Sequence, residues 1–191
     1  MPINDEITIV SGLPRCGTSL LMKMLEAGGI EPVTDNIRGA DLDNPKGYYE
    51  FEKVKTIAED SSWLPETRGK AFKMVSILLR NLPPNQRFKL IFMRREMGEV
   101  LASQSKMLEH MGKASGPTNE QMATLFTNHL AKIETWVAQR PEIEVLYVSY
   151  NDLVQNPSAV VERIKTFLNR PLNVDAMIAT VDISLYRNRG R

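Results

Sequence analysis

The sequence predicts an α/β fold in which helices flank a central parallel β-sheet. Short apolar runs typical of β-strands alternate along the chain with segments of helical periodicity, and this order favours parallel pairing. The first apolar run also ends in a glycine-containing turn that leads directly into a helical segment. A chain of 191 residues can build one sizeable core and is short for two, so we expect a single domain over residues 1–191.

The first half of the chain contains two expected strands and one clear helix. In order, the expected elements are a strand over 7–12, a helix over 18–27, a loop over 30–49, a helical segment over 50–60, a strand over 71–75 and an apolar segment over 77–82. Gly28-Gly29 closes the first helix as a C-cap. The loop over 30–49 is long enough to be functional.

The second half continues the alternation. Its expected elements are a strand over 88–93, a helix over 98–111, a long helix from Thr118, a strand over 144–148 and a helix opened by Asn156-Pro157. Gln121 is placed to form a capping box with Thr118. The long helix carries an apolar stripe that we interpret as core, made of Met122, Leu125, Phe126, Leu130, Ile133 and Trp136. His129 lies on this stripe and is interpreted as a buried structural histidine.

The turn after the first strand has the sequence of an anion cradle. Gly12 and Gly17 have the spacing of the nucleotide-binding P-loop, G-x-x-x-x-G-K followed by Ser or Thr. Thr18 stands where the lysine belongs, and Arg15 brings a cation inside the loop instead. Backbone N–H groups and the positive helix end would point at a phosphate-like group. This predicts a three-layer P-loop-like fold that binds an anion other than ATP, the alternative being an ordinary turn without a ligand.

A second basic element follows the strand over 88–93. ATP and GTP enzymes hold Mg²⁺ with a carboxylate from a second strand, but this strand runs into Arg94-Arg95, so we expect no metal requirement. Arg95 would lie at the carboxyl end of a central strand, where open α/β sheets bind ligands. Ser103 lies about two turns into the next helix and is available to the same anion. The alternative is a solvated strand end and a serine that merely fills a helix face.

Together these two elements resemble the sulfotransferase family, whose members take a sulfuryl group from 3′-phosphoadenosine 5′-phosphosulfate (PAPS). Pro14-Arg-Cys-Gly-Thr18 is similar to the family's loop for the 5′-phosphosulfate, and Arg95 with Ser103 matches the pair that grips the 3′-phosphate. Asn44-Pro-Lys-Gly-Tyr-Tyr-Glu50 is similar to a loop of many bacterial members, and the segment from Tyr147 to Leu168 is similar to the family's C-terminal part. The resemblance spans most of the chain.

The resemblance implies a sulfotransferase that moves a sulfuryl group to a hydroxyl or amine of a small-molecule or peptide acceptor and releases adenosine 3′,5′-bisphosphate (PAP). It implies that Arg15 contacts the leaving phosphate oxygen and the transferred group. The residues expected to bind the donor are Pro14, Arg15, Cys16, Gly17, Thr18, Ser19, Arg95, Ser103, Arg187 and Arg189. The last two belong to a basic C-terminal segment, which either folds over the 3′-phosphate beside Arg95 or is an ordinary disordered tail.

The proton acceptor expected from the resemblance is a carboxylate. No histidine precedes the second motif, so the histidine base of the cytosolic family members is absent. Asp35 lies near the place of the base in tyrosylprotein sulfotransferases, and Glu50 follows the Asn-Pro-Lys-Gly-Tyr-Tyr run, so these two are the leading candidates. Lys73, near the end of a short strand, is expected to help stabilise the sulfuryl oxygens. The ordinary alternative is that both carboxylates are solvated loop residues.

Two other functions remain open at this point. A P-loop nucleotide or nucleoside kinase-like protein, or a non-catalytic nucleotide binder, would share the cradle but should keep the loop lysine. A cysteine phosphatase with a Cys-x₅-Arg loop also wraps an oxyanion, but residue 22 is Met where that loop needs an arginine. Cys16 is more simply a small side chain in a tight turn than a reactive thiol.

The composition limits which partners and which cell compartment we expect for the protein. The chain has 24 Lys and Arg against 23 Asp and Glu, so no overall basic field favours nucleic acid. No apolar run approaches the ~20 residues of a membrane span, and the N-terminal residues lack the apolar region of a signal peptide. A single cysteine excludes an internal disulfide. We therefore expect a soluble cytoplasmic protein with no nucleic-acid or membrane partner.

Overall fold

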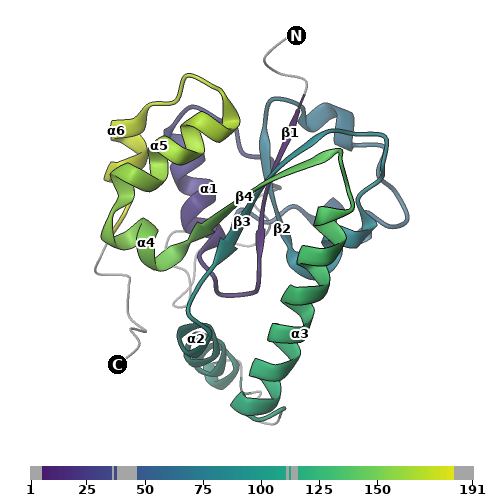
Figure 1. Ribbon diagram of the computed structural model, residues 1–191, viewed down its shortest axis with the longest axis vertical. Coiled ribbons are helices and arrows are strands. Elements are labelled where there is room, and N and C mark those ends of the chain that lie inside the picture. Colours follow the sequence, from purple (N-terminus) through teal and green to yellow (C-terminus); the bar gives the residue numbers. More distant parts are fainter. Residues whose placement is uncertain (1–5, 36, 38–46, 111, 113–115, 183–191) are drawn as a thin grey trace.

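The computed structural model describes residues 6–35, 37, 47–110, 112 and 116–182, and its centre is a parallel four-stranded sheet (Figure 1). The strands are β1 (Ile7–Gly12), β2 (Ala71–Val75), β3 (Phe88–Arg94) and β4 (Ile143–Ser149). Their order in the sheet is β2-β1-β3-β4, and every pairing is parallel. All four carboxyl ends therefore meet at one edge, where an open α/β sheet places its ligand. The α/β prediction is confirmed.

Two layers of helices cover the sheet. One face is covered by α1 (Thr18–Ala27), α5 (Pro157–Leu168) and α6 (Val174–Ala179), and the other by α3 (Asn119–Ala138) with the 3-10 helices η1 (Glu52–Thr56), η2 (Leu64–Thr67) and η3 (Ser76–Asn81) (Figure 1). The remaining helices, α2 (Met97–His110) and α4 (Tyr150–Gln155), directly follow β3 and β4, so they begin at the carboxyl edge. This is the predicted three-layer arrangement.

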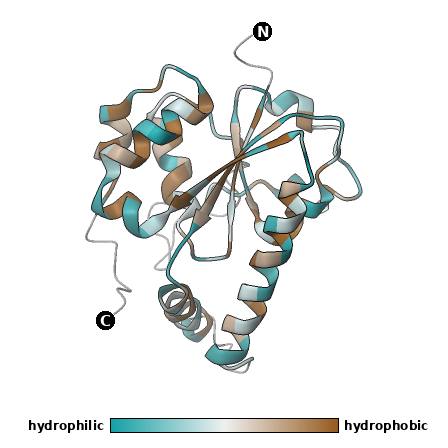
Figure 2. Cartoon of the chain, in the orientation of Figure 1, coloured by the Kyte–Doolittle hydropathy of each residue, from teal (hydrophilic) through white to brown (hydrophobic). Residues whose placement is uncertain are grey.

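The buried side chains of β1 explain why it lies inside the sheet. All six residues of β1 are buried, and successive side chains point to opposite faces. Val10 belongs to the core under α1, whereas Ile9 belongs to the core under α3. Figure 2 shows the same division, with hydrophobic residues concentrated on the strands and on the helix faces that meet them. A strand that is apolar on both faces can only be stable between two covered layers.

Local sequence signals set the element ends accurately. The observed bounds of β1, α1 and β2 equal the predicted ones, and those of β3, β4 and α2 differ by one residue. The capping box is present, with the Gln121 N–H donating to Thr118 Oγ1 over 3.2 Å and the Thr118 N–H to Gln121 Oε1 over 2.9 Å. Gly28 is the C-cap of α1, and Gly29 takes the left-handed conformation that favours glycine, with φ +98°.

The predicted elements need correction in four places. The helical segment expected over 50–60 is only the short η1, and helices α4 and α6 were not predicted. The apolar stripe of α3 is not all core, because Leu125 is 56% exposed while Ile133 is buried. The N-terminal half of α3 extends beyond the edge of the sheet, so it has no strand to pack against (Figure 1). His129 is half-buried, and its ring is hydrogen-bonded to Ser76 on η3.

None of the helices in the described part of the chain combines the length and the hydropathy needed to cross a membrane.

Candidate functional site

The loop between β1 and α1 holds its anion-binding shape through unusual backbone conformations. Arg15 has a left-handed φ of 67°, and Gly17, the N-cap residue of α1, has φ 96°. A Cβ at Gly17 would lie 2.3 Å from the ring of Tyr150, so both the backbone conformation and the space require glycine there. Because glycine has no side chain that could cap α1, the N–H groups of its first turn remain available to an anion.

Cys16 faces the core rather than the anion site. Its side chain is 1% exposed, and burial raises the pKa of the thiol to about 12. Its N–H donates to the carbonyl of Leu13 over 3.4 Å and so closes the turn. The side chain thus acts as a small apolar group beside Gly12, where an added Cβ would lie 2.5 Å from the Cys16 sulfur. A neutral buried thiol has no nucleophilic role.

The second motif meets the loop as the sequence predicts. Arg15 Nε donates to Ser103 Oγ over 3.0 Å, and Arg95 Nη1 donates to the carbonyl of Arg15 over 3.2 Å. Residues separated by 80 or more positions in sequence therefore form one side of the cradle. The three predicted donor-binding residues of this side lie together, where strand β3 passes into α2.

Arg95 is held by partners that sequence reasoning missed. Its Nε donates to Glu99 Oε2 over 2.8 Å, with side-chain exposures of 8% and 3%, and Asn151 Nδ2 donates to the other Glu99 oxygen over 3.1 Å. The guanidinium also lies 4.3 Å from the centre of the Tyr150 ring. Glu99 could have been found as the i+4 partner of Arg95 on a helix. Asn151 and Tyr150 come from α4 and carry no local signal of this contact.

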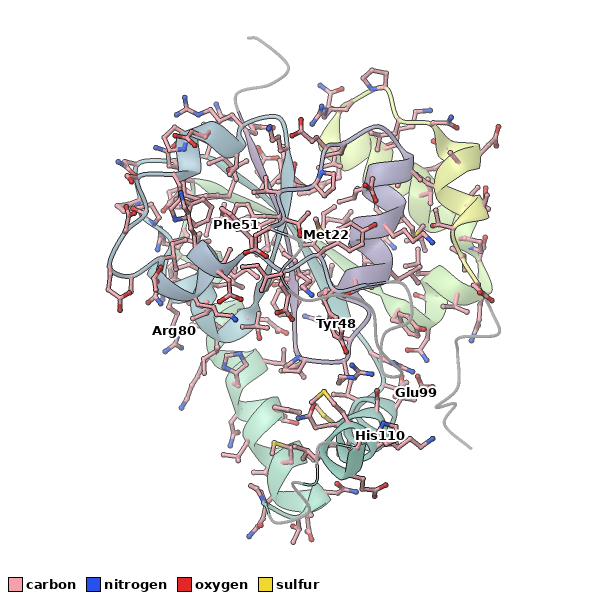
Figure 3. The ribbon with its side chains drawn as sticks, turned by 180° about the vertical axis from the view of Figure 1, so that it is seen from behind. Met22, Tyr48, Phe51, Arg80, Glu99 and His110 are labelled. Carbon is pink, nitrogen blue, oxygen red and sulfur yellow. The ribbon has the colours of Figure 1, made fainter. Side chains whose placement is uncertain are left out.

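Lys73 forms the other side of the cradle. Its Nζ donates to Ser19 Oγ over 3.3 Å and to the carbonyl of Tyr48, and it lies 5.7 Å from the centre of the Tyr48 ring. Ser19 Oγ in turn donates to the same carbonyl over 3.3 Å. Figure 3 shows Tyr48 beside the start of α1, and Glu99 on α2. Lys73 thus brings a second cation to the first turn of α1 from the neighbouring strand.

The two candidate carboxylates lie on segments that are hydrogen-bonded to each other. Asp35 Oδ2 accepts the Glu52 N–H over 2.6 Å and Oδ1 accepts the Ile37 N–H over 3.1 Å, and the Glu52 hydrogen bond is the main reason that the pKa of Asp35 is lowered. A carboxylate with a lowered pKa is a weaker base. The backbone carbonyl of Glu50 accepts the Asp35 N–H over 3.2 Å and Thr34 Oγ1 over 2.9 Å, so the two segments are joined.

The other predicted site residues differ in their exposure, and two of them lie outside the described residues. Pro14 is exposed at the tip of the loop, and Thr18 and Ser19 are half-buried in the first turn of α1. Arg187 and Arg189 lie outside the described residues. Over the described ranges, no cluster of three or more His, Cys, Asp and Glu side chains could hold a metal ion.

Comparison with known proteins finds a family model that matches most of the chain. The model of the sulfotransferase domain matches residues 5–188 of this chain. Sulfotransferase 1B1 of the dog (Canis lupus familiaris) is 25% identical over 97 residues, which are 47% of this chain and 33% of the dog protein. The matched part therefore spans about a third of that curated relative.

Solved structures show the same fold. Mouse sulfotransferase SULT7A1, complexed with PAP, is 17% identical with a TM-score of 0.61, and the match covers 98% of this chain and 67% of the mouse chain. The sulfotransferase domain of the Synechococcus PCC 7002 olefin synthase is 16% identical with a TM-score of 0.56, over 98% of this chain and 81% of that one. At these identities the likeness concerns the fold.

Proposed function

The chain belongs to the sulfotransferase family, and from this premise we propose that it transfers a sulfuryl group from PAPS to a hydroxyl or amine acceptor. The acceptor is a small molecule or a peptide, and PAP is the nucleotide product. The PAP bound by the mouse protein of the same fold supports this donor. The reaction requires no metal, because the cradle supplies its positive charge from side chains and backbone N–H groups.

The observation that carries the proposal is the two-sided cradle. Arg95 and Ser103 lie on the α2 side of the loop, where both contact Arg15, and Lys73 with Ser19 lies on the β2 side. PAPS carries anionic groups on both its 3′ and 5′ carbons, so it needs two anion subsites held at a fixed separation. A triphosphate needs one continuous track with a metal ion.

The chemistry follows from this arrangement. The acceptor atom attacks sulfur, the bond from sulfur to the 5′-phosphate oxygen breaks, and its electron pair leaves with PAP. The N–H groups of Gly17 and Thr18, with the Thr18 and Ser19 hydroxyls, would hold the 5′-phosphate, while Arg15 and Lys73 stabilise charge on the leaving oxygen and the sulfuryl oxygens. The fixed backbone of the loop means that little reorganisation is needed during the reaction.

The acceptor proton also needs a base. Of the two carboxylates predicted from sequence, Glu50 is favoured over Asp35, since both Asp35 oxygens accept backbone hydrogen bonds that lower its pKa. Neutral substitutions at both positions test this choice. If D35N and E50Q both keep the full rate of transfer, the base is neither carboxylate.

The donor assignment is tested with Arg15→Ala and with PAP analogues. Arg15→Ala should lower turnover of PAPS far more than affinity for PAP, and a variant with unchanged turnover would remove Arg15 from the reaction. Arg95 and Ser103 should make the protein prefer PAP to adenosine 5′-phosphate by roughly tenfold or more, because a hydrogen bond to a charged group contributes about 1.5–3 kcal/mol. Equal affinity for the two nucleotides by calorimetry would overturn the assignment of the 3′-phosphate site.

Three further parts of the proposal concern the C-terminal arginines, the cell compartment and the partners of the protein. Arg187 and Arg189 would meet the 3′-phosphate, and deleting residues 186–191 should then weaken PAP binding and flatten its salt dependence. The chain would work in the cytoplasm, where a protein with one cysteine needs no disulfide. Neither nucleic acid nor a membrane would be its partner, in keeping with a net charge of +1.

A further inference from the structure

The guanidinium of Arg95 is held by three separate contacts. Its Nε donates to Glu99 Oε2 over 2.8 Å, and its Nη1 donates to the carbonyl of Arg15 over 3.2 Å. Its central carbon lies 4.3 Å from the centre of the Tyr150 ring. A guanidinium is planar, so two directed hydrogen bonds and one stacked face leave its plane a single favourable orientation. The protein therefore sets the direction of this cation before any ligand binds.

Glu99 is itself held in place. One of its carboxylate oxygens accepts from Arg95, and the other accepts from Asn151 Nδ2 over 3.1 Å, a contact between residues 52 positions apart. The side chain of Glu99 is 3% exposed. A carboxylate bound through one oxygen can still turn about its last bond, whereas one bound through both oxygens cannot. Asn151 thus fixes the plane of the carboxylate on which Arg95 rests.

The position of Asn151 requires an amide. Its Oδ1 accepts the N–H of Glu96 over 3.3 Å at the turn between β3 and α2, while its Nδ2 donates to Glu99. Only an amide side chain offers an acceptor at one end and a donor at the other in this geometry. Asn151 therefore ties α4 to the start of α2 and aligns the two groups that hold Arg95.

Stability alone does not explain this arrangement. Replacing a buried ion pair by apolar side chains of similar volume is often neutral or stabilising, even though removing one partner is costly. The pair of Arg95 and Glu99 lies at the carboxyl edge of the sheet, where the donor cradle is built. A cation that is fixed in direction is useful there because hydrogen bonds from a guanidinium to a phosphate depend on geometry as well as on charge.

Resting on the function proposed above, we propose that Glu99 and Asn151 are positioning residues that orient Arg95 so that the site selects a phosphate on the 3′ carbon over one on the 2′ carbon. PAP and adenosine 2′,5′-bisphosphate carry the same charge and differ only in the place of one phosphate. A loosely held cation attracts both isomers equally. A guanidinium of fixed direction makes its hydrogen bonds with only one of them.

The test measures the affinity of the full chain for PAP, adenosine 2′,5′-bisphosphate and adenosine 5′-phosphate by calorimetry. The wild type should prefer PAP to the 2′,5′ isomer by about tenfold or more, the effect of one hydrogen bond to a charged group. Asn151→Asp places an oxygen where the N–H faced Glu99, so it should reduce this preference to about twofold or less. Affinity for adenosine 5′-phosphate should not change, whereas a merely structural role would lower all three affinities together.

Exchanging the two groups provides a rescue. Glu99→Gln alone should also lose the preference, because one amide oxygen cannot accept from both Arg95 and Asn151. In E99Q/N151D, the amide at 99 accepts from Arg95 and donates to the carboxylate at 151, which still accepts the Glu96 N–H. The double variant should therefore recover the preference to within about threefold of the wild type. Gln155→Glu makes the same amide-to-carboxylate change at an exposed position of α4 and should keep the preference unchanged.

The outcomes separate this inference from the proposed function. N151D with the wild-type preference, or a double variant no better than the two single ones, would overturn the positioning role. N151D retains both members of the ion pair, so it decides the question even where E99Q unfolds. A wild type that prefers PAP to adenosine 5′-phosphate but not to the 2′,5′ isomer would overturn the inference while the donor site stands. A protein with the predicted preferences that never releases PAP from PAPS would overturn the proposed function, and the role of Glu99 and Asn151 in nucleotide selection would remain.

Discussion

Two regions of the molecule are built in opposite ways. In the cradle, Arg15, Arg95, Glu99 and Ser103 hold one another through hydrogen bonds in a largely buried network. Where the end of β2 and η3 meet α3, Val75, Ile77 and Leu125 are exposed, and the hydrogen bond between His129 and Ser76 joins η3 to α3. A ligand of fixed charge and shape binds more tightly to a rigid, preorganised site, because less conformational entropy is lost on binding. Substitutions in the cradle should therefore reduce stability as well as anion binding, whereas substitutions of the exposed apolar side chains should reduce stability little.

The two neighbouring arginines of the second motif show the same contrast on a smaller scale. Arg94 pairs with Glu134 over 2.6 Å at side-chain exposures of 47% and 40%, whereas Arg95 pairs with Glu99 at 8% and 3%. The exposed pair is screened by water, and the buried pair leaves an uncompensated charge when one partner is lost. Adjacent residues of one type thus have very different energetic roles.

The largest effect on stability should come from breaking the buried pair. Glu99→Gln should lower the free energy of unfolding by about 3–5 kcal/mol, because Arg95 stays buried without its counter-ion. Glu134→Gln, the matched exposed change, should cost about 0–1 kcal/mol. Urea denaturation of both variants measures the difference. Equal losses would mean that burial does not distinguish the two pairs.

A smaller loss of stability should follow from adding one methyl group to the loop at Gly17. Gly17→Ala meets a left-handed φ, which costs roughly 1–2 kcal/mol, and the Tyr150 ring, which adds about 1–3 kcal/mol of overpacking. Gly29→Ala has a similar φ of +98° but no atom within 4 Å of the added Cβ, so it isolates the first cost. Thermal unfolding of both variants, with and without PAP, measures their losses of stability and their binding of PAP. If G17A binds PAP as well as G29A does, the loop is not the anion site.

Local patterns predicted the strand, turn and helix of the cradle well, because this part of it is contiguous in sequence. The strand, the turn with Gly12 and Gly17, and the helix start could all be derived from residues 7–27. The partners of Arg95 from α4 could not, since only the folded chain brings Tyr150 and Asn151 beside it.

The first half of α3 was harder to predict for a different reason. Leu125 fits a helical core stripe as well as it fits an exposed surface, because periodicity shows which side chains share a face but not what that face meets. His129 was interpreted as structural on the same stripe. The sheet ends before the first half of α3, which therefore has no strand beneath it, and this explains why Leu125 is exposed.

Asp35 offers a weaker effect that depends on pH. Its pKa is lowered by backbone hydrogen bonds, so its contribution to stability is present above the ordinary carboxyl pKa of about 4 and is lost as the pH falls through the lowered value. Asp35→Asn should therefore reduce the melting temperature at pH 7 and have little effect near pH 2. A constant difference between variant and wild type across this range would contradict the role of the charge.

The smallest effect is expected at Cys16. Because burial raises its pKa to about 12, only about one thiol in ten thousand is ionised at pH 8. Iodoacetamide should leave the native protein unlabelled for hours and label it rapidly in urea, as mass spectrometry would show. Rapid labelling of the native state would mean that the thiol is open to solvent and belongs to the site.

The ring of Tyr150, which lies against both Gly17 and Arg95, also ties the order of synthesis to the order of folding. β1 and its loop are made first, yet the aromatic side chain on which they rest is added near the end of the chain. At 5–20 residues per second the ribosome needs roughly 7–30 s to bridge that interval. Throughout it, the most apolar strand of the protein has no finished sheet. A stalled or truncated chain that stops before α4 should therefore be a client of chaperones and proteases.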